Sequence, residues 1–192
     1  MTRLHKTVLW VWAVIGLMGL APLAAPVVAK AAEEVEVLVF DVACDCRTGS
    51  PGFFAGGRGD PFIVSGKIFP AGTLPSGTAT NDPTQPVNGV SPIGDWTCRG
   101  QSAGVFPPTL APAYSSSPFA WNTQYFVLKN GSITSEGYAL PTGELLSITG
   151  GIRGFSGASG YLTETPFGTN VSGCPNFRAR FRLQSRGKHE RD

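Results

Sequence analysis

Asp41 is the first side chain in this sequence that could act as an acid or a base. It lies near the end of a predicted strand over 34–43 and, by strand alternation, shares a face with Val37 and Val39. We expect that apolar face to turn inward, which would place the carboxylate against a bound ligand, where proton transfer is useful. The alternative is a carboxylate at the rim of the fold that accepts a hydrogen bond from a turn amide.

Glu136 is the second candidate for acid–base catalysis. It lies on a predicted strand over 132–140 and shares a face with Thr134 and Tyr138. An inward orientation would give a carboxylate–phenol pair able to polarise a carbonyl or an epoxide. An outward orientation would make Glu136 an ordinary solvated acid, as most glutamates are.

Three further side chains are candidates for ligand binding, in addition to Tyr138. Trp96 and Tyr161 are aromatic residues that could line a cavity, although packing alone would also explain them. Arg153 could anchor a ligand carboxylate or cap a bend in the chain.

Several other chemistries lack the residues that they need. After residue 31 the chain has one histidine, His189, in a charged tail over 185–192, so a Ser-His-Asp mechanism has no base. The glycine-rich stretch precedes a strand and not a helix, which leaves no helix N-terminus for a phosphate. We therefore expect no cofactor and no nucleic-acid partner.

The N-terminus has the three parts of a secretory signal peptide. Arg3 and Lys6 precede an apolar run over 7–20, and Ala29-Lys30-Ala31 has the form of a cleavage site. We expect cleavage after residue 31, which would change the formal net charge from +2 to −1. The alternative is an uncleaved membrane anchor. Both interpretations predict a secreted, periplasmic or otherwise extracytoplasmic domain.

Four cysteines remain after that site, namely Cys44, Cys46, Cys98 and Cys174. An even number in an exported chain favours two disulfides, with three pairings open. A thiolate metal site and free thiols are the alternatives. The spacing does not match the paired hooks of a zinc ribbon, so we expect no metal.

The rest of the chain predicts an all-β domain over 32–184. No sustained helical period follows residue 31, and short segments rich in β-branched and aromatic residues alternate with turn clusters, as in a sandwich or barrel. Asn130-Gly131 is a strong hairpin signal. The predicted strands are 34–43, 61–69, 90–99, 119–129, 132–140, 144–149, 160–165 and 176–184.

Three segments resemble a known barrel superfamily. The segment 147–160 reads SITGGIRGFSGASG, 125–137 reads YFVLKNGSITSEG, and 59–66 reads GDPFIVSG. In this order they resemble the glycine-rich hairpin, the preceding hairpin and the second strand of the allene oxide cyclase and dirigent barrel superfamily. The chain departs from the dirigent pattern at Ile152 and Ser159.

The resemblance implies an eight-stranded antiparallel up-and-down barrel with an apolar central cavity. Phe155 is the one large residue of the glycine-rich segment, and we expect it to close one end of the barrel. It implies a small, largely apolar, phenolic or lipid-like ligand, and an isomerase or cyclase of the allene oxide cyclase type. A small homo-oligomer, a trimer or a dimer, is also implied. The alternative is a non-catalytic carrier or a structural or interaction barrel.

The implied topology also makes a prediction about the cysteines. The ends of the first and third strands and the start of the last strand meet at one rim of an up-and-down barrel, which would gather all four thiols. We expect one member of the Cys44/Cys46 pair to bond Cys174 and the other to bond Cys98.

Overall fold

A computed structural model describes residues 35–49, 59–102, 120–139 and 144–184. The predicted signal peptide and the predicted tail lie outside the described residues. The described part is almost entirely β-strand, with a single turn of 3-10 helix, η1 (Cys46–Thr48). The strands are β1 (Val35–Asp45), β2 (Pro61–Pro70), β3 (Gly77–Thr78), β4 (Gly94–Ser102), β5 (Ala120–Leu128), β6 (Gly131–Ala139), β7 (Glu144–Arg153), β8 (Ser159–Thr169) and β9 (Pro175–Gln184).

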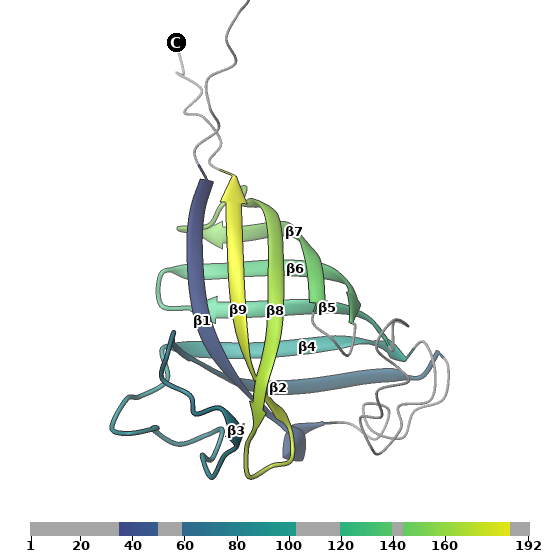
Figure 1. Ribbon diagram of the computed structural model, residues 1–192. Helices are drawn as coiled ribbons and strands as arrows, with labels where there is room; N and C mark the ends of the chain where they lie inside the picture. The colour runs from purple at the N-terminus through teal and green to yellow at the C-terminus, as the bar shows by residue number, and fades with distance from the viewer. Residues whose placement is uncertain (1–34, 50–58, 103–119, 140–143, 185–192) are drawn as a thin grey trace, which may run out of the picture. The chain divides into compact units, whose positions relative to one another are not determined.

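The strands form one sheet that closes on itself. β1 pairs with β2, β2 with β4, each later strand with the next, and β9 pairs back with β1, all antiparallel. In Figure 1, β1, β9 and β8 cross in front of β4 to β7. The short β3 lies outside this ring and pairs in parallel with the end of β8. The expected eight-stranded up-and-down barrel is confirmed.

Strand pairing moves several boundaries away from the predicted ones. β4 starts at Gly94 and not at residue 90, because Val87 and Val90 form an isolated bridge before it. β7 runs on to Arg153, because its glycine-rich second half still pairs with β6 across a register shift.

The last strand, β9, shows most clearly how the sequence makes an inside and an outside. Its side chains alternate between a buried row of Phe177, Ala179, Phe181 and Leu183 and an exposed row of arginines. The predicted two-faced strand is therefore confirmed.

Bulky apolar side chains fill one end of the barrel. This is the end where β5 passes into β6, and Phe126 and Phe181 meet there from opposite walls, with ring centroids 4.8 Å apart. Phe155, on the bend after β7, belongs to the same core cluster and is 9 % exposed. It closes this end of the barrel as expected.

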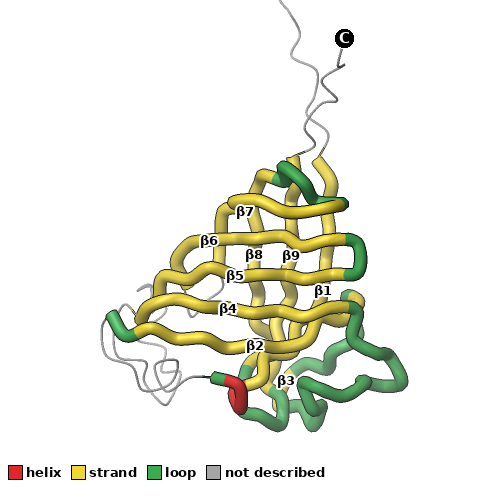
Figure 2. Tube along the Cα trace, turned by 180° about the vertical axis from the view of Figure 1, so that it is seen from behind, coloured by secondary structure: helices red, strands yellow, loops and turns green. Residues whose placement is uncertain are grey.

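The loop between β2 and β4 packs on the outside of the barrel. Its residues Leu74 and Val87 form a second apolar cluster with Ala43 of β1 and Phe69 of β2. Figure 2 shows this loop together with β3 on one side of the barrel. The cluster covers the outer face of the second half of β1. Asp41 lies on this outer face and is therefore buried.

Candidate functional site

A chain of buried polar side chains crosses the interior of the barrel. The indole nitrogen of Trp96 on β4 donates a 2.7 Å hydrogen bond to Oε1 of Gln124 on β5. Nε2 of Gln124 then donates to Oε2 of Glu164 on β8 at 3.1 Å. All three residues are less than 9 % exposed. Because an indole N–H can only donate, it fixes which end of the Gln124 amide faces the carboxyl group.

Strand alternation directs these side chains inward. On β5, Asn122, Gln124 and Phe126 are buried, whereas the intervening residues lie on the outer face. On β8, Leu162 and Glu164 are buried in the same way. Gln124 and Glu164 therefore lie in the inward-facing rows of β5 and β8, and strand pairing buries them.

The polar chain joins walls that are not neighbours. β5 and β8 are separated by β6 and β7 in the ring of strands, so the Gln124–Glu164 bond spans the interior. Trp96 also packs edge-on against Phe177 of β9, with centroids 5.2 Å apart. Trp96, Gln124, Glu164 and Phe177 thus form a layer across the barrel interior, which we call the floor.

Small and polar side chains line the interior beyond this floor, at the end where β4 stops and β5 starts. They are Ser102, Ala120, Asn122, Ser135 and Ala139, all 7 % exposed or less. Phe62 of β2 is also buried at this end, opposite Gly100, so the end is distinguished by its polar groups and not by an absence of bulky side chains. These buried polar groups make the floor and this end the candidate ligand site.

Ser135 is a notable member of this group. It is fully buried on β6 beside Gln124 in the cross-strand register, and its hydroxyl has no hydrogen-bond partner among the described residues. The β6–β7 register shifts between Thr134 and Ser135. Such irregularities commonly re-aim a side chain next to a functional site.

The thiol of Cys44 belongs to the same interior. Burial, followed by the negative charges of Asp45 and Glu164, raises the pKa of this thiol above its ordinary range. A thiol held in its protonated form is a poor nucleophile. The Cys44 thiol is therefore an inert core group.

The structure places Asp41 on the outside of the barrel wall, under the β2–β4 loop. Its Oδ2 accepts hydrogen bonds from the amides of Gly72 (2.7 Å) and Leu74 (3.2 Å), and its Oδ1 accepts one from Nε of Arg178 (2.9 Å). The carboxylate holds a turn, which is the alternative that the sequence left open.

The inward orientation expected for Val37 and Val39 is wrong. Val37 is 43 % exposed, and the core-facing residues of β1 are Leu38, Phe40 and Val42. Both rows of β1 are apolar, so alternation alone could not choose between them.

Glu136 and Tyr138 also lie on the outer face, as the buried residues of β6 are Ile133, Ser135 and Ala139. Tyr138 is 53 % exposed and packs edge-on against Trp121. The carboxylate–phenol pair is therefore not in the interior.

The remaining predicted ligand residues are divided between the interior and the surface. Trp96 is in the interior and forms part of the floor. Tyr161 lies on the outer face of β8 with Arg182 over its ring at 5.9 Å. Arg153 is exposed, has a positive φ of 55° and forms the bend after β7. Of these three residues, only Trp96 belongs to the polar chain.

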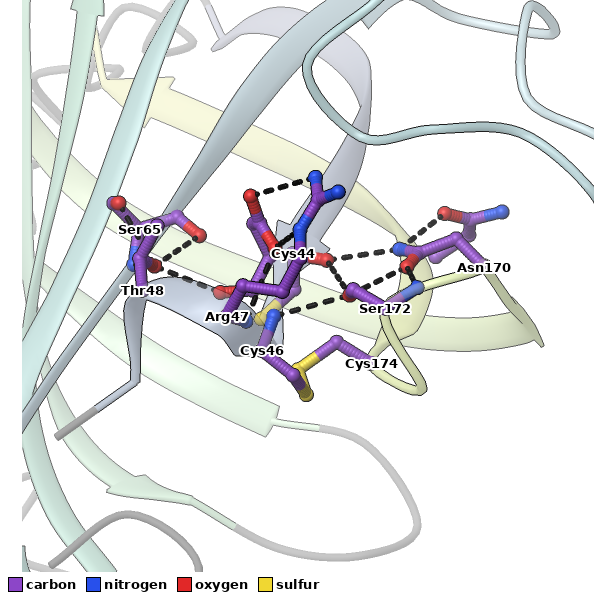
Figure 3. The surroundings of a disulfide bond; sticks show 10 residues. Cys44, Cys46, Arg47, Thr48, Ser65, Asn170, Ser172 and Cys174 are labelled. Carbon is purple, nitrogen blue, oxygen red and sulfur yellow. Dashed lines mark hydrogen bonds and ion pairs between the residues drawn. A yellow bond between two sulfur atoms is a disulfide. The ribbon is translucent and has the colours of Figure 1, made fainter. Parts of the chain in front are cut away.

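One of the two expected disulfides is present. Cys46, just after β1, bonds Cys174, just before β9, with Cα atoms 5.2 Å apart. Around it, the hydroxyl of Ser172 accepts from the amide of Cys46, and Nδ2 of Asn170 donates to the carbonyl of Cys44 (Figure 3). The bond thus joins the first and last strands of the ring.

The second expected disulfide, between Cys44 and Cys98, is absent, and both cysteines are buried. Cys44 lies opposite Gly66 of β2, whereas Cys98 lies opposite Val64. Two strand spacings of about 4.8 Å therefore separate the two cysteines, beyond the reach of roughly 7 Å between Cα atoms. The prediction of a Cys44–Cys98 disulfide was wrong because β2 lies between β1 and β4.

Gln124, Glu164 and Ser135 were not expected from the sequence. The predicted ligand residues on β6 and β8 were Tyr138 and Tyr161, which lie on the outer rows, opposite to the rows of Ser135 and Glu164. The signal that could have found Glu164 is the arginine row of β9. Arg182 pairs with Tyr161, which puts Tyr161 outside and Glu164 inside.

Within the described ranges, no three His, Cys, Asp or Glu side chains lie close enough to hold a metal ion. No helix in the described part of the chain is long and apolar enough to cross a bilayer.

Comparisons with known proteins give likenesses in structure alone. No family model matches the chain, and no curated protein is similar to it in sequence. A solved structure titled "Pyocyanin demethylase" is 18 % identical, with a TM-score of 0.51 over 78 % of this chain and 100 % of that one.

Two further structures are more distant. The Diels Alderase AbmU from Streptomyces koyangensis is 13 % identical, with a TM-score of 0.43 over 85 % of this chain and 76 % of that one. A nonspecific heme-binding cyclase that catalyses [4 + 2] cycloaddition during neoabyssomicin biosynthesis is 15 % identical, with a TM-score of 0.41 over 80 % of this chain and 68 % of that one. At these identities, what this chain shares with the demethylase structure is its fold.

Proposed function

We propose that this barrel binds a small, largely apolar molecule that carries an oxygen atom, at the end lined by small and polar side chains. The observation that carries the proposal is the buried Trp96–Gln124–Glu164 chain, which crosses the interior of the barrel. Ligand sites combine apolar walls with a few fixed polar groups of this kind. An eight-stranded barrel has room for one small ligand.

Three polar side chains define the class of ligand. The hydroxyl of Ser135 can donate to an oxygen acceptor, and leaving it buried without a partner costs roughly 1–3 kcal/mol. Glu164 and Gln124 lie beside it across the floor. A carbonyl, epoxide or phenolic oxygen on an apolar body satisfies these groups.

The catalytic form of the proposal assigns acid–base work to Glu164, in place of Asp41 and Glu136. The Glu164 carboxylate would take a proton from a ligand carbon, and the carboxyl group so formed would give that proton to the ligand oxygen. The two transfers balance without a co-reactant, which suits an isomerase or cyclase of the allene oxide cyclase type. Gln124 would position the carboxyl group through its 3.1 Å hydrogen bond.

The proposal places this activity outside the cytoplasm. The predicted signal peptide motivates it, and the Cys46–Cys174 disulfide fits an oxidising compartment. A carrier without catalysis is the second candidate, favoured by the single carboxyl group in the described interior, since acid–base enzymes commonly use two groups.

Native mass spectrometry of the protein as purified tests for a bound molecule, and the apolar dye N-phenyl-1-naphthylamine tests for a site. We expect saturable dye binding that Ala139→Leu abolishes by filling the interior. Ser135→Ala and Gln124→Leu should change dye affinity, and Glu136→Gln on the outer face is the matched control.

Glu164→Gln separates the two candidates once a co-purified ligand is identified. An enzyme loses turnover in this variant and keeps affinity, whereas a carrier has no turnover to lose. The binding proposal fails if the wild type shows neither a bound mass nor saturable dye binding, or if Ala139→Leu, still folded by circular dichroism, binds the dye as well as the wild type does.

A further inference from the structure

The outer face of β4, β5 and β6 exposes aromatic side chains on a regular strand surface. Tyr138 is 53 % exposed and Trp121 is 44 % exposed, and their rings meet edge-on with centroids 4.9 Å apart. Val127 is 49 % exposed on the same face of β5. Tyrosine, tryptophan and arginine are the residues that dominate binding energy in protein interfaces.

Opposite charges flank β5 on this face. In the cross-strand register, Arg99 of β4 and Glu136 of β6 both lie opposite Thr123 of β5, one strand away on either side. Arg99 lies over the ring of Tyr125 at 5.1 Å, and Glu136 accepts a long hydrogen bond from Thr123 at 3.4 Å. The two charges form no ion pair with each other among the described residues.

We propose that two copies of this chain form a dimer through this face, with a two-fold axis parallel to β5 between the two sheets. Such an axis lays β4 of each copy over β6 of the other. Arg99 then faces Glu136 of the second copy, twice over, and Trp121 faces its own counterpart. A two-fold interface must be self-complementary in this manner.

The neighbouring rows fit the same axis. It sets Gln101 against Tyr138 and Thr97 against Thr134 of the second copy, and it brings no like charges together on these three strands. An in-plane axis across the strands through Thr123 would instead set Arg99 against Arg99 and Glu136 against Glu136. Charge complementarity therefore selects the axis along β5.

A charge swap tests both the face and the axis. Sedimentation velocity of the purified protein at low and moderate salt gives the dimer dissociation constant. Arg99→Glu alone and Glu136→Arg alone each set like charges opposite each other twice, so each should weaken the dimer at least tenfold. The double variant Arg99→Glu/Glu136→Arg restores opposite charges and should recover wild-type affinity.

Two more variants sharpen the test. Trp121→Ala removes the central aromatic contact and should weaken the dimer at least tenfold, because hot-spot truncations have effects of this size or larger. Arg180→Glu, exposed on β9 and away from this face, is the matched control and should leave the dimer unchanged. Circular dichroism confirms that each variant is folded.

The outcomes that overturn the proposal are distinct. A protein that is monomeric at all accessible concentrations, or one that forms trimers, has no such dimer. A dimer that all three face variants leave intact uses another surface. A double variant that stays as weak as the single ones refutes the axis along β5. None of these outcomes bears on ligand binding inside the barrel.

Discussion

Removal of the Cys46–Cys174 disulfide tests how the ring of strands is held closed. The bond joins residues 128 positions apart and links the end of β1 to the start of β9. In the chain-entropy model, a crosslink over a loop of this size restricts the unfolded chain by about 5 kcal/mol at 25 °C. Since domains are commonly stable by only about 5–15 kcal/mol, we expect a large loss.

The native contacts around the bond do not depend on it. The hydroxyl of Ser172 still accepts from the amide of residue 46, and Asn170 still bonds the carbonyl of Cys44. We therefore expect Cys46→Ser/Cys174→Ser to keep the barrel and to lose stability chiefly through a freer unfolded chain. The denaturant slope m should rise, because an uncrosslinked unfolded chain exposes more surface.

Urea unfolding followed by tryptophan fluorescence measures the difference. We expect a loss of roughly 2–5 kcal/mol, below the entropic maximum because native strain and residual structure reduce it. Cys98→Ala, which leaves the bond in place, is the control and should lose less. If mass analysis shows the wild type oxidised and the double variant lies within about 1 kcal/mol of it, closure by the disulfide is not what stabilises the barrel.

Three further predictions concern titration and packing. Burial raises the pKa of the Cys44 thiol, so the folded protein disfavours its ionised form. The stability contributed by this group is fully present below the unfolded thiol's pKa of about 8.5 and falls as the pH rises above that value. Wild type should therefore lose more stability than Cys44→Ala in alkaline urea titrations. Hydrogen bonds from Arg47 hold the pKa of Asp82 well below its usual range, so their stabilisation is present above the unfolded pKa of about 3.9 and lost below it. The urea midpoint should therefore fall less at acid pH in Asp82→Asn than in the wild type. Phe181→Ala, which empties the contact with Phe126, should cost about 3–5 kcal/mol in urea unfolding, and Phe181→Leu clearly less.

The sequence predicted the elements of the fold because local patterns determine them. The hairpin that Asn130-Gly131 predicted joins β5 and β6, with Lys129 and Asn130 in the turn and Gly131 as the first residue of β6. The two faces of β9 are clear because one is apolar and the other bears arginines. The disulfide to Cys174 followed from closure of the ring. These features depend on neighbours in sequence or on the order of the strands.

The site was harder to predict because it depends on register. On β5 both rows mix aromatic and polar residues, so Asn122 and Gln124 could not be distinguished from Thr123 and Tyr125 as the inner row. On β1 both rows are apolar, and the loop that buries Asp41 bonds it through residues 31 and 33 positions away in sequence. A shift of one residue exchanges the two faces, and only the partner strands determine it.

The pairing of β1 with β9 has a consequence for how the chain reaches this fold. Asp41 and Arg178, which meet across that pair, are 137 residues apart, so the first strand to be synthesised finds this partner only after nearly all the rest. Until then one side of β1 is an open strand edge, which can pair with a strand of another molecule. The nascent barrel therefore depends on protection of that edge, by a chaperone or by speed, until its last strand arrives.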